Sequence, residues 1–178
     1  MTIRIAMWSG PRNISTAMMR AFEARGDCAV SDEPLYAHYL KHTELDHPMK
    51  NEVMASQPTD WQPVIKSLVN DSPGEKPFWY QKHMTHHLLP HIDREWMKEV
   101  RHCFLIRDPK EVLSSYTKSR TEVTVDDLGF EAQAEILSLG NSKGRRVCSI
   151  EGLASQLSKK LMAVFYWPQK GILIQYLI

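Results

Sequence analysis

Residues 3–22 read IRIAMWSGPRNISTAMMRAF and predict a short apolar strand, a sharp polar turn and an amphipathic helix. A glycine and a proline end the strand, and Arg12 places a fixed positive charge in the turn. Ser15 and Thr16 put two hydroxyl groups at the start of the helix, where backbone N–H groups have no partner within the helix. This arrangement is typical of an anion-binding loop, because the N–H groups and the helix N-terminus together attract a phosphate.

The chain has the length and composition of one globular α/β domain. It holds 178 residues, of which 43% are hydrophobic and 24% are charged. No apolar run is long enough to cross a bilayer and no secretory leader pattern is present, so we expect a cytoplasmic protein without a membrane partner. Cys28, Cys103 and Cys148 form no CxxC pair, and their odd number argues against a disulfide framework, so we expect buried thiols.

The charge changes sign near the C-terminal end of the sequence. Residues up to Ser138 carry 16 Lys and Arg against 20 Asp and Glu, a net of −4, whereas the last 40 residues carry 6 against 1, a net of +5. This change predicts an α/β domain over 1–139 and an atypical, poorly ordered tail over 140–178, as in an altered or truncated form of a longer chain. No stripe of basic and aromatic residues indicates nucleic-acid binding.

Apolar and aromatic runs predict three more strands, at 28–30, 78–83 and 100–106. Five prolines are scattered through residues 41–77, which favours short helices and loops that cover a site. A last helix is expected over 126–139. This order predicts an α/β fold in three layers, α/β/α, with a mostly parallel sheet whose ligands lie at the carboxyl ends of the strands.

Two junctions between strands and helices carry acidic residues. Asp108 is expected to cap a helix with Pro109 as its first residue, and Glu111 is expected to complete a capping box. Glu33 precedes a proline, which biases it away from helix. Two interpretations of Glu33 stay open, a side chain directed into the site and a helix cap.

Polar residues that can bind an anion follow three of the predicted strands. The candidates are Arg12, Ser15 and Thr16 after the first strand, Lys82 and His83 at the end of the 78–83 strand, and Arg107 and Ser115 after the 100–106 strand. An Arg at a strand end and a Ser in the next helix can address one phosphate, the first as a cationic fork and the second as a hydroxyl donor. Two such sites predict a ligand with two separated anionic groups.

The sequence resembles the sulfotransferase family, P-loop NTPase-like proteins that use 3′-phosphoadenosine 5′-phosphosulfate. The resemblance lies in three stretches in the same order, Pro11–Met18, Gln81–Pro90 and Ile106–Tyr116. It implies that Arg12, Asn13, Ser15 and Thr16 hold the 5′-phosphosulfate and that Arg107 and Ser115 hold the 3′-phosphate. One departure lies in the first stretch, where Ile14 occupies a position at which the family usually has glycine.

The same resemblance implies roles in sulfonate transfer to a hydroxyl or amine of a small-molecule acceptor. His83 would be the general base that takes the acceptor proton. Lys82 or Arg12 would neutralise charge on the bridging oxygen of the leaving phosphate. The family's in-line transfer needs no metal, so no metal is expected.

Two other functions stay open. A nucleotide kinase or NTPase uses the same loop geometry, but the Walker pattern needs a Lys before Thr16, where this chain has Ser15. A catalytically inactive nucleotide-binding module is the second alternative. The sequence also holds a histidine group, His83, His86, His87 and His91, but it has no HExxH glutamate and Pro90 interrupts the helix, which disfavours zinc.

Overall fold

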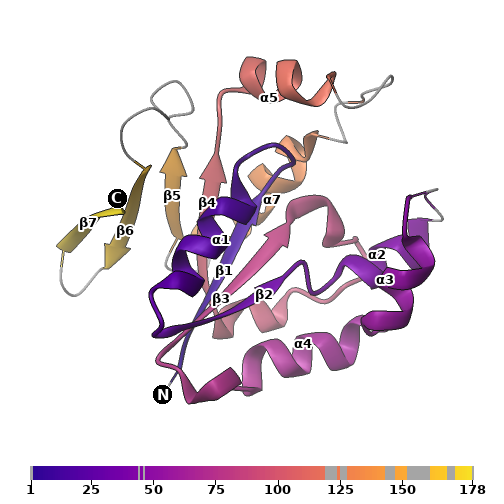
Figure 1. The fold of residues 1–178 in the computed structure, drawn as a ribbon, viewed down its shortest axis with the longest axis horizontal. Coiled ribbons are helices and arrows are strands. Elements are labelled where there is room, and N and C mark those ends of the chain that lie inside the picture. Colours follow the sequence, from indigo (N-terminus) through magenta and orange to yellow (C-terminus); the bar gives the residue numbers. More distant parts are fainter. Residues whose placement is uncertain are drawn as a thin grey trace.

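The chain alternates strands and helices along most of its length (Figure 1). The computed structural model describes residues 2–43, 45, 47–118, 124, 128–142, 147–151, 161–167 and 171–177. The strands are β1 (Ile3–Ser9), β2 (Cys28–Asp32), β3 (Phe78–Met84), β4 (Arg101–Ile106), β5 (Val147–Glu151), β6 (Leu161–Trp167) and β7 (Gly171–Leu177). The α-helices are α1 (Ser15–Ala24), α2 (Tyr36–Thr43), α3 (Lys50–Ser56), α4 (Trp61–Asn70), α5 (Pro109–Tyr116) and α7 (Phe130–Ser142). The 3-10 helices are η1 (Pro73–Glu75), η2 (Thr85–His87) and η3 (Glu95–Glu99).

The main sheet has five strands in the order β2-β3-β1-β4-β5. Every neighbouring pair in it is parallel, so the carboxyl ends of these strands meet at one edge. β6 and β7 form a separate antiparallel pair. The predicted α/β class with a mostly parallel sheet is confirmed.

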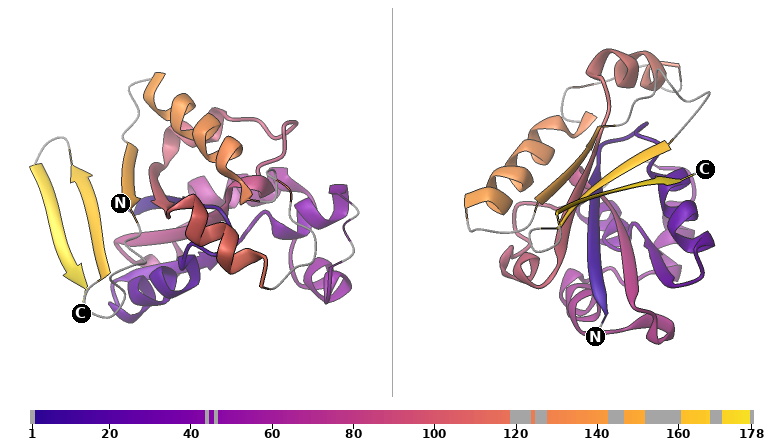
Figure 2. Two further views of the ribbon diagram at one scale, coloured as in Figure 1. Left: turned by 90° about the horizontal axis from the view of Figure 1, so that it is seen from above. Right: turned by 90° about the vertical axis from the view of Figure 1, so that its left-hand side faces the viewer.

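Helices pack on both faces of the main sheet, with α1 and α7 on opposite sides in Figure 2. On the α1 face, Met18, Met19 and Phe22 join the buried core with strand residues such as Met7 and Tyr80. The opposite face is covered by α4, η3 and α7, whose buried residues include Val64, Ile65, Leu68, Trp96, Met97 and Ile136. The strands are buried on both faces, as expected of a parallel sheet between two helical layers, and the three-layer prediction is confirmed.

The helix that follows β4 begins as predicted but uses Glu111 differently. Asp108 is the N-cap, and its side chain accepts a hydrogen bond from the backbone N–H of Lys110, while Pro109 is the first helical residue. Glu111 was expected to complete a capping box, yet its carboxylate accepts a hydrogen bond from Arg107 Nε at 3.1 Å. An adjacent guanidinium is a stronger donor than a backbone N–H, because the hydrogen bond is charge-assisted.

The proposed boundary at residue 139 stays a prediction. Residues 1–139 contain the elements from β1 to most of α7, whereas α7 ends at Ser142 and β5 pairs with β4 beyond that point. Much of 140–178 lies outside the described residues, and the expected poor order of this tail stays a prediction. Among the described residues, no helix is both long and apolar enough to span a membrane.

The prediction of buried thiols holds for the cysteines whose side chains are described. Cys28 and Cys103 are both buried thiols. The side chain of Cys148 lies outside the described residues.

Candidate functional site

The candidate site lies where the carboxyl ends of β1, β2, β3 and β4 meet. From β1 the chain passes β3 to reach β2 at one edge of the sheet. From β3 it passes back over β1 to reach β4. The two connections therefore run in opposite directions across the sheet, and β1 lies where they diverge. Ligands of open parallel sheets bind in the crevice at such a point. A cavity of about 500 Å³ opens here, lined by Pro11, Glu33, Tyr36, Tyr39, Leu40, Leu45, His47, Met84, His86, His87 and Tyr116.

The loop between β1 and α1 has a backbone built for close approach of an anion. Arg12 and Ile14 both have positive φ, of 61° and 53°. Ile14 is the N-cap of α1, and no side chain caps the helix there. The hydroxyl groups of Ser15 and Thr16 at the start of the helix are therefore not explained by helix capping. A β-branched residue in the left-handed region costs about 1–2 kcal/mol of conformational free energy. Ile14 therefore adds strain at a position that glycine would occupy without it.

The residues predicted to form two anion sites are connected directly. Arg12 Nε donates a hydrogen bond to Ser115 Oγ at 3.0 Å. Arg107 donates from its Nη1 to the backbone oxygen of Arg12 at 2.9 Å. The loop after β1 is therefore joined to the segment after β4 through Ser115 and through Arg107, and the neighbouring residues Pro11 and Tyr116 line the cavity.

Asn13 adds an unsatisfied amide to this loop. Its side chain is 2% exposed, and within the described part of the chain neither Nδ2 nor Oδ1 has a hydrogen-bond partner. A buried polar group without a partner costs about 1–3 kcal/mol. Such a group in an anion-binding loop favours a ligand that completes its hydrogen bonds.

Gly10 fixes how closely this loop packs against Leu128, two residues before α7. A Cβ atom at Gly10 would lie 2.4 Å from the backbone oxygen of Leu128, so Gly10→Ala must displace the loop. We expect this substitution to lower the free energy of unfolding by about 1–3 kcal/mol, measured by urea denaturation. The sequence predicts that this loop binds the 5′ end of 3′-phosphoadenosine 5′-phosphosulfate. On that prediction, a folded Gly10→Ala protein should bind 3′-phosphoadenosine 5′-phosphate at least about tenfold more weakly, or roughly 1.4 kcal/mol.

The matched control for this prediction is Gly26→Ala, at the other end of α1. Gly26 has φ of 82° and open space around it, so alanine there strains the backbone without moving the loop. Nucleotide affinity should be unchanged in Gly26→Ala. Equal affinities of the Gly10→Ala and Gly26→Ala proteins would contradict the prediction.

Lys82 is held by carboxylates at the end of β2. It is 3% exposed, and its Nζ lies 2.7 Å from Asp32 Oδ1 and 2.5 Å from Glu33 Oε1. Burial lowers the pKa of Lys82, but the two carboxylates outweigh it and leave the pKa raised, so the ammonium stays charged. Lys82 faces the same side of the sheet as Met7, whereas the next residue in β3 faces the opposite side.

His83 points into the core on the α4 face. It is 2% exposed, its ring stacks on Trp8 with centroids 4.5 Å apart, and its Nε2 has no hydrogen-bond partner among the described residues. Burial, with a smaller contribution from His102, lowers the pKa of His83 to about 3. His83 is thus neutral near pH 7, and its role as a general base stays a prediction.

The cavity wall carries histidines that the sequence interpretation did not assign to the site. His86 and His87 follow β3 in η2, and both line the cavity with Glu33. His87 Nδ1 lies 3.9 Å from Glu33 Oε2, and its ring stacks on Tyr36 with centroids 4.8 Å apart. Burial lowers the pKa of His87 well below its ordinary value, so this contact is not an ion pair and Glu33 is neutralised by Lys82 instead. The paired histidines just after the 78–83 strand were the available signal in the sequence.

Of the two interpretations of Glu33, the side chain directed into the site matches the structure, whereas no helix cap by that side chain is found among the described residues. Its side chain lines the cavity, and its backbone oxygen accepts a hydrogen bond from Tyr36 at the start of α2. The covering segment, 41–77, contributes Leu45 and His47 to the cavity wall, while its helix α4 packs into the core instead.

A model of the sulfotransferase domain matches residues 3–156. The chain belongs to the sulfotransferase domain family. The match spans β1 to β5 and so includes the loop after β1, the end of β3 and the Arg107–Ser115 segment. The resemblance stated from three short stretches is confirmed at the level of the family.

Two similar relatives of this sulfotransferase-family chain come from Arabidopsis thaliana. Branched-chain-amino-acid aminotransferase-like protein 2 is 40% identical over 114 residues, and branched-chain-amino-acid aminotransferase-like protein 1 is 39% identical over 114 residues. Each match covers 64% of this chain and 20% of the relative. The chain thus matches about a fifth of the length of these relatives, and the activity in their names is not carried over to it.

Proposed function

We propose that this sulfotransferase-family chain transfers a sulfonate group from 3′-phosphoadenosine 5′-phosphosulfate to a hydroxyl or amine of a small-molecule acceptor. The observation that carries the proposal is the direct connection of Arg12, Ser115 and Arg107 at the carboxyl edge of the sheet. Two fixed cations beside a helix N-terminus suit a nucleotide with phosphate groups at two positions. The cytoplasm remains the proposed location.

The residues present fit this nucleotide. Ser15 and Thr16 begin α1, where backbone N–H groups are available to a phosphate oxygen. The unsatisfied amide of Asn13 can donate to the same group. Arg107 and Ser115 would hold the 3′-phosphate, and Arg107 also holds the anion loop through the Arg12 backbone oxygen.

When bound, the phosphosulfate supplies an electrophilic sulfur, whose bond to the bridging phosphate oxygen breaks as the acceptor oxygen or nitrogen bonds to it. Arg12 would stabilise the negative charge that develops on that bridging oxygen. Lys82 is engaged by Asp32 and Glu33, so it would act by fixing Glu33 in the cavity wall. The cavity beside Pro11 and Tyr116 has the size of a site for a small acceptor.

The proton of the acceptor has two proposed destinations. His83 is the base that the family resemblance implies, but its lowered pKa makes it a weak acceptor of a proton. His86 lines the cavity three residues later. Single-turnover transfer by His83→Ala and His86→Ala separates these two, since loss of the true base slows transfer by about 100-fold or more while nucleotide affinity is kept.

Calorimetric titration tests the donor class. The protein should bind 3′-phosphoadenosine 5′-phosphate with one site per chain, and ATP with magnesium should bind more weakly. Tighter binding of ATP with magnesium would favour a nucleotide kinase or NTPase. Binding of 3′-phosphoadenosine 5′-phosphate without transfer to any of a panel of phenols, alcohols and amines would favour an inactive nucleotide-binding module. No binding of this nucleotide at high micromolar protein would refute both the sulfotransferase and the inactive module.

A further inference from the structure

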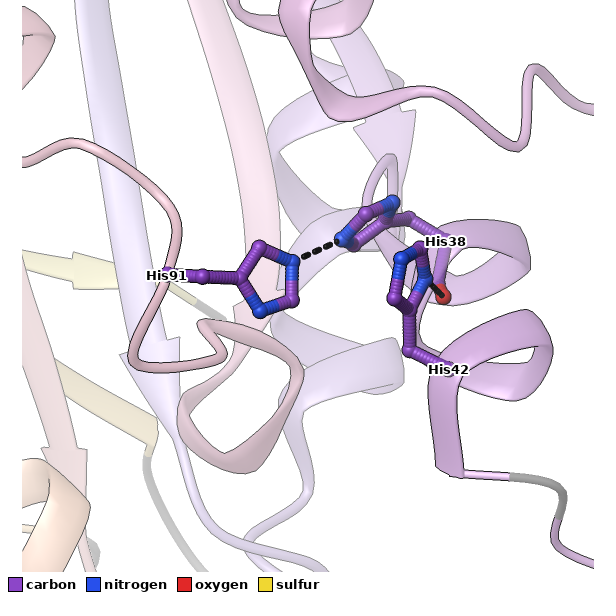
Figure 3. Close-up of side chains that lie close together, drawn as sticks. All are labelled: His38, His42 and His91. Carbon is purple, nitrogen blue, oxygen red and sulfur yellow. Dashed lines mark hydrogen bonds between the residues drawn. The ribbon is translucent and has the colours of Figure 1, made fainter.

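Three histidines from two distant parts of the sequence lie close together, one of them buried and two exposed (Figure 3). His38 and His42 lie one turn apart on α2, and His91 follows η2. One ring nitrogen of each lies within 4.8 Å of the others, and the Nε2 atoms of His38 and His91 are 2.8 Å apart. Because imidazole is a common ligand of divalent transition metals, this cluster has the composition of a metal site.

The hydrogen bonds of the cluster orient two of the rings for metal binding. His38 Nδ1 lies 3.0 Å from the backbone oxygen of Thr59, and His42 Nδ1 lies 3.0 Å from the backbone oxygen of His38. A carbonyl only accepts, so both Nδ1 atoms carry the proton when the rings are neutral, and both Nε2 atoms keep a lone pair. Hydrogen bonds of this kind hold the histidine ligands of protein metal sites in one tautomer and orientation.

The same reasoning explains the contact between His38 and His91. Since His38 Nε2 has no proton, His91 Nε2 donates to it across the 2.8 Å contact. A metal ion would bind both nitrogens once the proton of His91 moves from Nε2 to Nδ1, which leaves a lone pair on each Nε2 atom. Zinc–nitrogen bonds of 2.0–2.1 Å in a tetrahedron separate the nitrogens by about 3.3 Å, so the two rings need to part by only about half an ångström.

We propose that His38, His42 and His91 bind one zinc ion, with water as the fourth ligand. The ion would join α2 to the segment after η2. Both elements carry residues of the cavity wall, Tyr36 and Tyr39 on α2 and His86 and His87 on η2. Zinc would therefore fix the distance between two walls of the cavity, a structural role that does not depend on the proposed sulfonate transfer.

This set differs from the histidine group considered in the sequence. His83 lies in the core and His86 and His87 line the cavity, so His91 alone of that group belongs to the cluster. Its partners are 49 and 53 residues earlier in the chain, a separation that no local spacing pattern reports.

Zinc titration of the full chain, without a polyhistidine tag and after treatment with a chelator, tests the proposal. Competition with a chromophoric chelator should give one zinc per chain with a dissociation constant of about 1 µM or below. His42→Ala and His91→Ala should each weaken zinc binding by about 100-fold or more, because removing a ligand costs at least as much as removing its outer partner. His42 and His91 are exposed, so both variants should fold, which circular dichroism checks.

The matched control is His47→Ala, a histidine outside the cluster, which should bind zinc with unchanged affinity. Cobalt, used as a visible probe, should give the intense bands of a four-coordinate ion in the wild type and in His47→Ala, and lose them in His91→Gln. A stoichiometry below one half, or less than a tenfold loss of zinc affinity in either alanine variant, would overturn the site. Because zinc is measured without nucleotide, failure here is distinguishable from failure of the proposed function.

Discussion

Replacing Arg107 by alanine is expected to weaken binding of 3′-phosphoadenosine 5′-phosphate by about 100-fold, or roughly 3 kcal/mol. The proposed role of Arg107 is to pair with the 3′-phosphate as a charged, forked donor, which is the strongest type of hydrogen bond available to this ligand. Adenosine 5′-phosphosulfate lacks that phosphate, so its affinity should fall much less. Calorimetry with both nucleotides on both proteins measures the difference.

The comparison of two nucleotides is needed because Arg107 also supports the anion loop. Its Nη1 donates to the backbone oxygen of Arg12, and this contact would be lost for either ligand. Equal weakening of both nucleotides would show that Arg107 only supports the loop, and would contradict the 3′-phosphate assignment. Arg20→Ala is a matched control, because Arg20 is an exposed arginine of α1 that pairs with Glu23, and it should leave both affinities unchanged.

Acidification from pH 7 to pH 5 is expected to remove about 2 kcal/mol of stability through His83 alone. The pKa of His83 is lowered to about 3 by burial, while the unfolded chain titrates near 6.5. Between these values the unfolded state binds a proton that the folded state does not, so the free energy of unfolding rises with pH. Each pH unit below 6.5 costs about 1.4 kcal/mol until the folded-state pKa is reached.

His83→Phe isolates this contribution. Phenylalanine can keep the stacking on Trp8 and does not titrate. Between pH 7 and pH 5 the free energy of unfolding of the variant should therefore fall by about 2 kcal/mol less than that of the wild type. Urea denaturation at pH 7, 6 and 5 measures both proteins. His87 is also buried with a lowered pKa, so part of the acid sensitivity should remain in the variant. Identical pH dependence in the two proteins would show that His83 titrates normally in the folded state.

The strands and the anion loop were predictable because their signals are local. An apolar run such as residues 100–106 specifies a buried strand by itself, and Asp108-Pro109 specifies where the next helix begins. The order of strands and helices then restricts the fold to a parallel sheet whose carboxyl edge binds ligands. Arg12 and Arg107 follow strands that turned out to be neighbours, so both were assigned to that edge from sequence.

The side chains at the end of β3 were not predictable in the same way. A strand buried on both faces has no polar side to identify its site face, so Lys82 and His83 looked equally suited to the site. Packing decided their surroundings, since Asp32 and Glu33 bind the first and Trp8 stacks on the second. The burial that sets the pKa of His83 depends on α4, η3 and α7, which are distant in sequence.

The stretch of residues 3–22 shows the same division between local and tertiary information. Its sequence alone determined a strand, a turn with a cation and a helix N-terminus, because these depend on neighbours within a few residues. The tertiary structure alone decided that Arg12 meets Ser115, that Gly10 packs against Leu128, and that His91 meets His38 and His42. Those contacts join residues 49 to 118 positions apart. Local propensity carries no information at such separations, and only the packing of strands and helices around a common core brings these residues together.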